Sequence, residues 1–390
     1  MSFKITKNLA RKKETPCDIS FIDKKTAESI RKFHQTFPQY KKTPLRELKS
    51  VAATLSVKNI FVKDESLRFG LNAFKVLGGS YAIGNIIAEK LGEKLENLTF
   101  EKIISKETAE RIGKLTFISA TDGNHGRGVA WTANKLFQKC VIYMPKGSSH
   151  ERLENIRREN AEASITDFNY DDSVRLAAKD AEKNGWILVQ DTSWNGYEKI
   201  PRWILQGYTT LSLEIIEQLK STKPTHVFLQ AGVGSFASSV VGFLANIYGN
   251  KMPFITIVEP NAADCIFKTL QANDGKIHSV MGEMNTIMAG LACGEPVSIG
   301  ISILRKYVDF CISCPDSAAE TGMKILASPQ ANIISGESGA APFGCIYEIL
   351  TNPNLSSMKE MLGLSEESVL LFISTEGDTD KENYKKIVGV

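Results

Sequence analysis

Hydrophobic runs of strand length alternate along most of the chain with segments whose apolar residues recur at helical spacing. The runs are short and rich in branched and aromatic residues, as in NIFV, TFISA, CVIYM, HVFLQ, FITIV and VLLFIS. Between them stand amphipathic segments such as HERLENIRREN and DDSVRLAAKDAEKNG. This alternation predicts an α/β protein with parallel sheets covered by helices on both faces. Such sheets bind ligands at the carboxyl ends of their strands, so functional residues are expected in the loops that follow strands.

Length and composition are those of a globular protein with more than one unit. The chain has 390 residues, 43% hydrophobic and 23% charged, which suggests two domains or one large α/β unit with a subdomain. The formal net charge is +3 and both signs are mixed throughout, so neither nucleic acid nor an anionic membrane is indicated as a partner. The first residues lack the apolar core of a signal peptide and no apolar run could span a bilayer, so we expect a cytoplasmic protein.

The seven cysteines are scattered through the chain, which favours buried thiols over a disulfide framework. Cys311 and Cys314 form one CxxC motif in DFCISCPDS. A zinc site would need two more ligands at similar spacing, and none follow. A redox pair stays open, but two cysteines at the end of a strand are the favoured interpretation. We expect no metal.

A single lysine, Lys75, stands in the apolar stretch LNAFKVLGGSYAI. Its charge could reach the surface from one face of a helix. Alternatively, it is a reactive amine in an enclosed site, where apolar surroundings would lower its pKa. Gly78 and Gly79 follow and would allow other backbone to approach closely.

A second candidate is the loop in FLQAGVGSFASSVVGF, where Gly232, Val233, Gly234 and Ser235 lie between a predicted strand and a predicted helix. Glycines let the backbone turn tightly, and a helix start offers free N–H groups to a phosphate. The spacing does not match the dinucleotide pattern, because Ala237 stands where a third glycine would be. A tight strand–helix turn without a ligand stays the alternative.

The third candidate is the loop TDGNHG, residues 121–126, which also follows a predicted strand. Backbone amides at a helix start suit a carboxylate ligand. Asp122 would repel such an anion, so its carboxylate is more plausibly there to meet a cation or take a proton. His125 could be a catalytic base, but a structural, hydrogen-bonded role is favoured for it.

Two more strand ends carry polar residues. Asp191 follows the run WILVQ, where an aspartate is commonly an N-cap. Ser374 and Thr375 follow the last hydrophobic strand, where hydroxyls often only hold a turn.

These motifs occur in the same order in the pyridoxal-phosphate enzymes of the tryptophan-synthase-β type, a family that includes threonine dehydratase and serine racemase. The chain resembles them in NAFK, TDGNHG, the glycine loop and the hydroxyl after the last strand, and QGYTTLSLEI, VEP and ESGAA look like further family segments. Asp122 replaces an alanine usual in the family, and WILVQDTSW, TIMAGLACGEP and STEGDTD are together similar to the diaminopropionate ammonia-lyases. The resemblance implies the two-domain fold type II, with residues 1–85 and 191–390 in a large cofactor-binding domain and 86–190 in a small domain. A homodimer is common in this family.

The resemblance also implies pyridoxal 5'-phosphate as the cofactor, joined to Lys75 as a Schiff base. The other binding positions carried over are Gly232, Val233, Gly234 and Ser235 for the phosphate, Asn124 for the phenolic oxygen, Thr375 (or Ser374) for the pyridine nitrogen, and the backbone of Thr121, Gly123 and His125 for the substrate carboxylate.

The reaction implied converts 2,3-diaminopropionate and water into pyruvate and two ammonia, from both the D and the L isomer. Their α-protons point to opposite faces of the cofactor, so Lys75 would serve the L form and Asp122 the D form. Asp191 would hold or protonate the distal amino group. The nearest alternative is a threonine or serine dehydratase, or a serine racemase, of the same fold. A non-enzymatic binding protein is the alternative from a different class, and a nicotinamide oxidoreductase is disfavoured by the glycine spacing.

Overall fold

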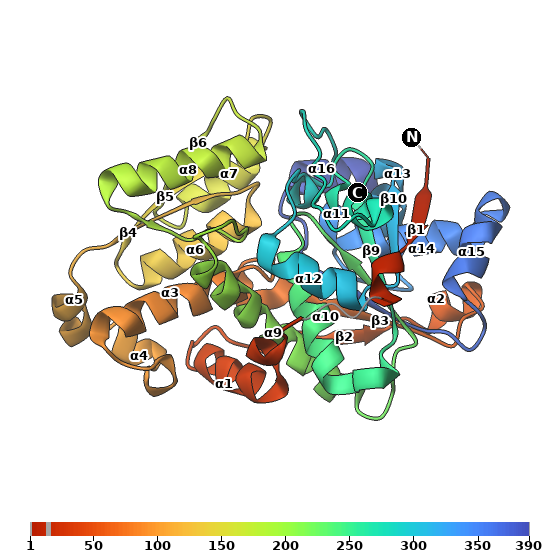
Figure 1. Cartoon of the computed structure of the whole chain (residues 1–390), viewed down its shortest axis with the longest axis horizontal. Helices are drawn as coiled ribbons and strands as arrows, with labels where there is room; N and C mark the ends of the chain where they lie inside the picture. Colours follow the sequence, from red (N-terminus) through yellow and green to blue (C-terminus); the bar gives the residue numbers. More distant parts are fainter. Residues whose placement is uncertain (1, 13–16, 390) are drawn as a thin grey trace.

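Two sheets with helices on their faces make up the protein (Figure 1). The computed structural model describes residues 2–12 and 17–389. The larger sheet has seven strands in the order β1-β10-β9-β8-β11-β3-β2, and the smaller has four in the order β6-β5-β4-β7. The strands are β1 (Lys4–Lys7), β2 (Leu45–Glu47), β3 (Asn59–Asp64), β4 (Thr116–Ala120), β5 (Lys139–Met144), β6 (Glu162–Ile165), β7 (Ile187–Leu188), β8 (His226–Gln230), β9 (Phe254–Pro260), β10 (Phe310–Cys314) and β11 (Val369–Ser374).

The predicted parallel strands are present, and the larger sheet adds two edge strands that the sequence pattern did not predict. All pairings within the smaller sheet are parallel, as are those that join β10, β9, β8, β11 and β3. The edge strands β1 and β2 run antiparallel to their neighbours. They are only four and three residues long, KITK and LRE, which is too short for a clear apolar pattern.

Helices cover both sheets, with α6, α7 and α8 around the smaller one on the left of Figure 1. The four strands of that sheet fall within residues 86–190, the predicted small domain, whose limits stay a prediction. The helices are α1 (Lys24–Gln35), α2 (Lys49–Thr54), α3 (Val76–Leu91), α4 (Phe100–Ile103), α5 (Lys106–Ile112), α6 (Asn124–Lys135), α7 (His150–Arg157), α8 (Tyr170–Asn184), α9 (Lys199–Leu219), α10 (Ser235–Tyr248), α11 (Cys265–Ala272), α12 (Ser298–Tyr307), α13 (Asp316–Ala327), α14 (Glu337–Thr351), α15 (Ser356–Leu362) and α16 (Lys381–Val388).

The glycine pair after Lys75 lies at the start of α3, where two other helices approach closely. A Cβ added to Gly78 would lie 2.6 Å from the ring of Tyr208 in α9, and one added to Gly79 would lie 3.4 Å from the backbone of Val129 in α6. The close approach predicted for this pair is confirmed. Lys75 immediately precedes α3, so the close packing at the start of this helix places it near both α9 and α6.

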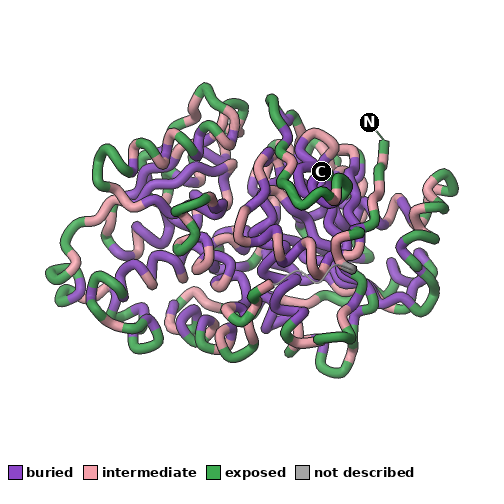
Figure 2. Tube along the Cα trace, viewed as in Figure 1, coloured by how far each residue is buried: buried purple, intermediate pink, exposed green. Residues whose placement is uncertain are grey.

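Buried residues follow the strands of both sheets (Figure 2). Every residue of β8 and β11 is buried, as expected for parallel strands with both faces covered. The seven cysteines are free thiols, six of them buried, and Cys311 and Cys314 both lie on β10.

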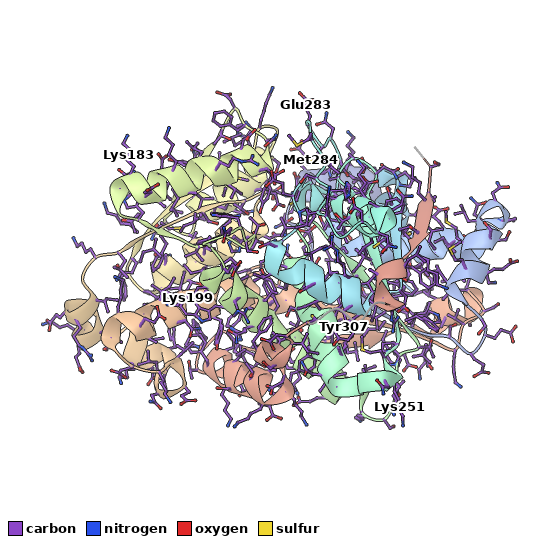
Figure 3. All side chains as sticks on the ribbon, in the orientation of Figure 1. Lys183, Lys199, Lys251, Glu283, Met284 and Tyr307 are labelled. Atoms are coloured by element: carbon purple, nitrogen blue, oxygen red, sulfur yellow. The ribbon has the colours of Figure 1, made fainter. Side chains whose placement is uncertain are left out.

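Charged side chains are spread over the surface, among them Lys183 at the end of α8 and Lys199 at the start of α9 (Figure 3). Across the described ranges, no helix has the length and apolar character needed to cross a lipid bilayer. Nor do the described residues gather three or more His, Cys, Asp or Glu side chains in a way that could hold a metal ion.

Candidate active site

A cavity lies where loops of the two sheets meet. Four segments form much of its wall: Phe74 and Lys75 before α3, the TDGNHG loop after β4, the glycine loop after β8, and Thr375 and Glu376 after β11. Other residues complete the lining, among them Tyr170, Asp191, Tyr208, Gly290, Cys293 and Ser338. Three of these segments follow the carboxyl ends of strands, the location expected for a ligand in such sheets. The cavity therefore brings together the predicted loops, which lie far apart in the sequence.

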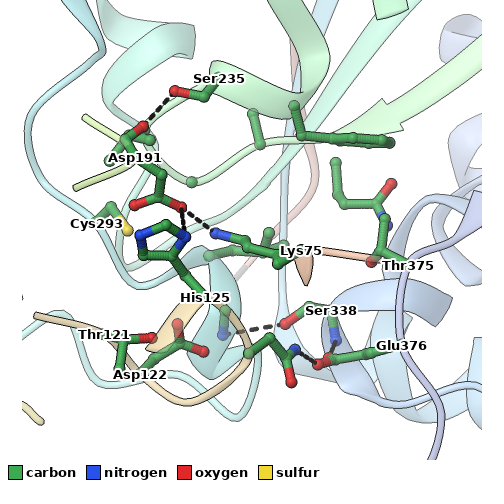
Figure 4. A pocket seen from close by; sticks show the side chains of 18 of the residues that line it. Lys75, Thr121, Asp122, His125, Asp191, Ser235, Cys293, Ser338, Thr375 and Glu376 are labelled. Carbon is green, nitrogen blue, oxygen red and sulfur yellow. Dashed lines mark hydrogen bonds and ion pairs between the residues drawn. The ribbon is translucent and has the colours of Figure 1, made fainter. Parts of the chain in front are cut away.

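Lys75 forms an ion pair with Asp191 inside this cavity, with 2.5 Å between Nζ and Oδ2 (Figure 4). Of the two interpretations of Lys75, the enclosed amine is correct. The expected lowering of its pKa is wrong, however. Burial is the largest single effect and acts to lower the pKa, but Asp191, with smaller contributions from Tyr208 and Asp122, raises the pKa of Lys75 above its ordinary value.

Asp191 is itself held in place by neighbours rather than capping a helix. Burial acts to raise the pKa of its carboxyl group, but His125 and Lys75 lower it below its ordinary range. The hydroxyl of Tyr170 donates to its Oδ1 at 3.2 Å. Because α9 begins only at Lys199, the N-cap interpretation of Asp191 is wrong.

The ion pair predicts how the free lysine reacts with an aldehyde. Only a neutral amine attacks a carbonyl, and a raised pKa keeps Lys75 protonated to higher pH than an ordinary lysine. Attachment of pyridoxal phosphate to the apoprotein should therefore become faster as pH rises. In Asp191→Asn the rise should occur at lower pH, because the charge that raises the pKa is gone. Stopped-flow absorbance of the apoprotein mixed with the aldehyde measures this, and an unchanged pH dependence would contradict the role given to Asp191.

The glycine loop has the shape of an anion cradle. Gly234 has φ +95°, a conformation that favours glycine, and Ser235 begins the fourteen-residue helix α10. A Cβ added to Gly232 would lie 3.1 Å from both the Gly290 carbonyl oxygen and the Cys293 sulfur. The N–H groups of the first helical turn have no partner within the helix, so this loop fits a phosphate group. The Ser235 hydroxyl also donates to the Asp191 carbonyl oxygen at 2.5 Å, which ties the cradle to the ion pair.

The TDGNHG loop is shaped by its own side chains. The Thr121 hydroxyl accepts hydrogen bonds from the N–H groups of Gly123 and Gly126 at 3.0 and 3.1 Å. Nε2 of His125 donates to the Val189 carbonyl oxygen at 2.8 Å, and burial lowers the pKa of its ring. This geometry agrees with the structural role favoured for His125.

Asp122 lies apart from the ion pair, with His125 between them in the view of Figure 4. Its Oδ2 is buried and has no hydrogen-bond partner among the described residues. A buried carboxylate oxygen without a hydrogen-bond partner costs free energy of folding unless a ligand interacts with it. The position of Asp122 is therefore compatible with contact to the substrate.

The two candidate hydroxyls behave differently. Thr375 lines the cavity, and its Oγ1 accepts from Nε2 of Gln230 at 2.8 Å, which leaves the hydroxyl proton available to a ligand. The Ser374 hydroxyl donates to Ser335 at 2.7 Å and is not among the groups that line the cavity. The geometry therefore favours Thr375 for the pyridine nitrogen.

Comparisons with known proteins agree with this site. The sequence pattern of the family "Pyridoxal-phosphate dependent enzyme" matches residues 36–361. The diaminopropionate ammonia-lyase of Salmonella typhimurium is 48% identical over 389 residues, which cover 98% of this chain and 96% of that protein. The one of Escherichia coli K12 is 50% identical over 368 residues, 93% and 91% of the two chains. The chain belongs to the diaminopropionate ammonia-lyase family. Its cofactor is pyridoxal phosphate.

Solved structures of this family share the fold. The holo diaminopropionate ammonia-lyase of Escherichia coli is 47% identical with a TM-score of 0.92, and the match covers 99% of this chain and 96% of that one. The complex of the same enzyme with D-serine is 46% identical, also with a TM-score of 0.92, over 99% and 97%. Threonine deaminase from Solanum lycopersicum, 19% identical with a TM-score of 0.72, shares the fold alone. Fold type II is confirmed.

Several residues around the cofactor site were not predicted. The Glu376 carboxylate accepts from Nδ2 of Asn124 and, at 3.1 Å, from the N–H of Ser338. Tyr208 lies against the start of α3, and its hydroxyl has no partner among the described residues. All three unpredicted residues lie inside segments that resemble the family, STEGDTD, ESGAA and QGYTTLSLEI. The segments were visible, but a resemblance does not tell which side chain in a segment points inward.

Proposed function

We propose that this protein converts 2,3-diaminopropionate and water into pyruvate and two ammonia, and that it accepts both the D and the L isomer. The observation that carries the proposal is the presence of Lys75, Asp122 and Asp191 around one cavity. A diamino acid brings a second ammonium group into the site, and a buried ammonium needs a carboxylate partner. A hydroxy amino acid has no such need. A dehydratase would therefore explain Asp191 only as the partner of Lys75 and would give Asp122 no role in the cavity.

The bound cofactor supplies an electron sink for the negative charge that develops at Cα. Lys75 removes the α-proton of the L isomer, and Asp122 removes that of the D isomer from the other side. Asp191 holds the distal amino group as an ammonium, which leaves as ammonia. Of the two roles suggested for Asp191, holding this group fits better than protonating it, because the pKa of its carboxyl group lies below the ordinary range. Water then releases the second ammonia and pyruvate.

The binding groups have separate tasks in this proposal. Gly232 to Ser235 hold the cofactor phosphate, Asn124 meets the phenolic oxygen and Thr375 the pyridine nitrogen. A neutral hydroxyl at that nitrogen leaves it unprotonated, which favours elimination over transamination. The backbone of residues 121–125 holds the substrate carboxylate, since N–H groups at a helix start suit an anion. The N–H groups of Thr121 and Gly123 donate to the Tyr143 carbonyl and the Thr121 hydroxyl, so this contact falls to the other N–H groups of the loop.

A turnover assay tests the proposal against its alternatives. Pyruvate formation is measured with D- and L-2,3-diaminopropionate, serine and threonine at equal concentration. We expect both diaminopropionate isomers to exceed serine and threonine in kcat/KM. A preference for serine or threonine would indicate a dehydratase, and recovery of the opposite enantiomer in place of pyruvate would indicate a racemase.

We also propose a homodimer in the cytoplasm, as is common for enzymes of this fold. The chain mass is 43.0 kDa. Light scattering should give twice that mass, and a value equal to the chain mass would contradict the dimer.

A further inference from the structure

A buried arginine that no motif indicated, Arg152, lies next to Asp122. It is on α7 and only 6% exposed. Its Nη1 lies 3.8 Å from Oδ2 of Asp122, and its Nη2 lies 3.4 Å from Oε2 of Glu337. One guanidinium therefore joins a cavity carboxylate of the TDGNHG loop to the first residue of α14.

Arg152 reaches Asp122 from behind the loop. Gly123 has φ +152°, and a Cβ added there would lie 3.2 Å from Cδ of Arg152. The arginine side chain thus packs beneath Gly123, and it is not among the described residues that line the cavity. From this position it can act on Asp122 without touching a ligand.

Charged groups of both signs lie near Asp122, whereas those near Arg152 are carboxylates. The groups that interact electrostatically with Asp122 are Lys75, His125, Arg152, Tyr170, Cys293 and Glu376. Those that interact with Arg152 are Asp122, Glu337, Glu376 and Asp380. Lys75 is already paired with Asp191, and Arg152 is a cation that lies beside the carboxylates of both Asp122 and Glu337.

The distance from Arg152 to Asp122 is also informative. A separation of 3.8 Å is too long for a hydrogen bond, and Oδ2 of Asp122 has no hydrogen-bond partner in the described part of the chain. The arginine thus compensates the charge of Asp122 without donating a hydrogen bond to this oxygen, so a lone pair remains free to accept a proton. A guanidinium hydrogen-bonded to the same oxygen would occupy the lone pair that a base needs.

We propose that Arg152 is a positioning residue that keeps Asp122 charged and open, and so sets the pH range in which the D isomer is turned over. The inference rests on the proposed function, in which Asp122 is the base for the D isomer. Removing the positive charge takes away the cation that lies 3.8 Å from Oδ2 of Asp122, and with it the electrostatic stabilisation of the negative carboxylate. The L isomer uses Lys75, whose ion-pair partner is Asp191 at 2.5 Å and not Asp122, so we expect its pH profile to stay in place.

The test compares pH profiles of kcat/KM for both isomers in Arg152→Gln and Glu337→Gln. In Arg152→Gln the acid limb of the D profile should move up by about one to three pH units, and the D-to-L ratio near pH 6 should fall by about tenfold or more. In Glu337→Gln, which removes a competing negative charge, the D limb should move to lower pH. The L profile should stay in place in both variants.

Three further variants and measurements serve as controls. Arg152→Lys keeps the charge and should bring the D profile back toward that of the wild type. Arg127→Gln removes another half-buried arginine, paired with Glu159 at 3.6 Å, and should leave both profiles unchanged. Affinity of each apoprotein for pyridoxal phosphate, followed by absorbance, should equal that of the wild type, because Arg152 acts on Asp122 and not on the cofactor.

Equal loss for both isomers with unmoved pH limbs would overturn the inference, since it would indicate a purely structural arginine. A raised KM for both isomers at unchanged kcat would also overturn it, because Arg152 would then bind the substrate carboxylate. If Arg152→Gln does not fold, the opposite shift in Glu337→Gln decides: an unmoved D limb there contradicts the inference. Failure of the proposed function is separate, because the wild type itself would then turn over neither isomer.

Discussion

Asp122→Asn should lower turnover of D-2,3-diaminopropionate by about 10²- to 10⁴-fold, the range for loss of a positioned acid or base. Asparagine has the same shape but cannot accept the α-proton. Oδ2 of Asp122 has no hydrogen-bond partner to lose among the described residues, and its ion pair with Arg152 is long, at 3.8 Å. We therefore expect turnover of the L isomer to stay within a few-fold of the wild type. Steady-state pyruvate release with each isomer measures both effects.

Asp180→Asn is the matched control for this prediction. Asp180 belongs to α8 of the same unit, and its Oδ2 accepts from the Tyr143 hydroxyl at 2.7 Å. Asparagine can accept the same hydrogen bond, so turnover of both isomers should persist. Equal loss of D and L turnover in Asp122→Asn would remove the assignment of a separate base to each isomer.

Lys75→Ala should lower turnover of both isomers by at least about 10²-fold. It should also remove the visible absorption of the lysine-bound cofactor. Lys75 is the covalent anchor in this account, and it is also the base for the L isomer. Its loss therefore affects both substrates, in contrast to the loss of Asp122. Absorbance of the purified protein after incubation with pyridoxal phosphate, together with pyruvate release, measures the two effects.

Lys75→Arg separates chemistry from electrostatics. Arginine keeps a positive charge beside Asp191, so the buried carboxylate stays compensated, but it cannot form the bond to the aldehyde. It should be as inactive and as colourless as Lys75→Ala. Lys199→Ala, which removes an exposed lysine at the start of α9 (Figure 3), should change neither colour nor turnover. A visible band in Lys75→Ala would mean that another lysine is the anchor.

The fold and most cavity residues could be predicted because they depend on local patterns. Strands such as β8 and β11 contain continuous apolar runs, VFL and VLLFI, and each is followed by a loop whose glycines or hydroxyls are unusual at a strand end. Parallel sheets bring such loops together regardless of their separation in the sequence. Asn124 and Thr375 lie in such loops, and the family resemblance supplied their roles. Lys75 was found from its apolar setting and from the same resemblance.

What could not be predicted depends on pairs that only the folded chain brings together. The pKa of Lys75 is raised, not lowered, because Asp191, 116 positions away, lies beside it. Arg152 stands in HERLENIRREN, which reads as an ordinary amphipathic helix, and only the fold places it under Gly123. Glu376 adjoins Thr375 in sequence, but its bond to Asn124 crosses from one sheet's loops to the other's.

Reduction of the holoenzyme with borohydride, followed by mass spectrometry of its peptides, tests the central claim most directly. Borohydride converts the link between a lysine and the cofactor aldehyde into a stable amine. We expect the added pyridoxyl mass on the peptide that contains NAFK, at Lys75. The same mass on a peptide with any other lysine, or on none, would contradict the account.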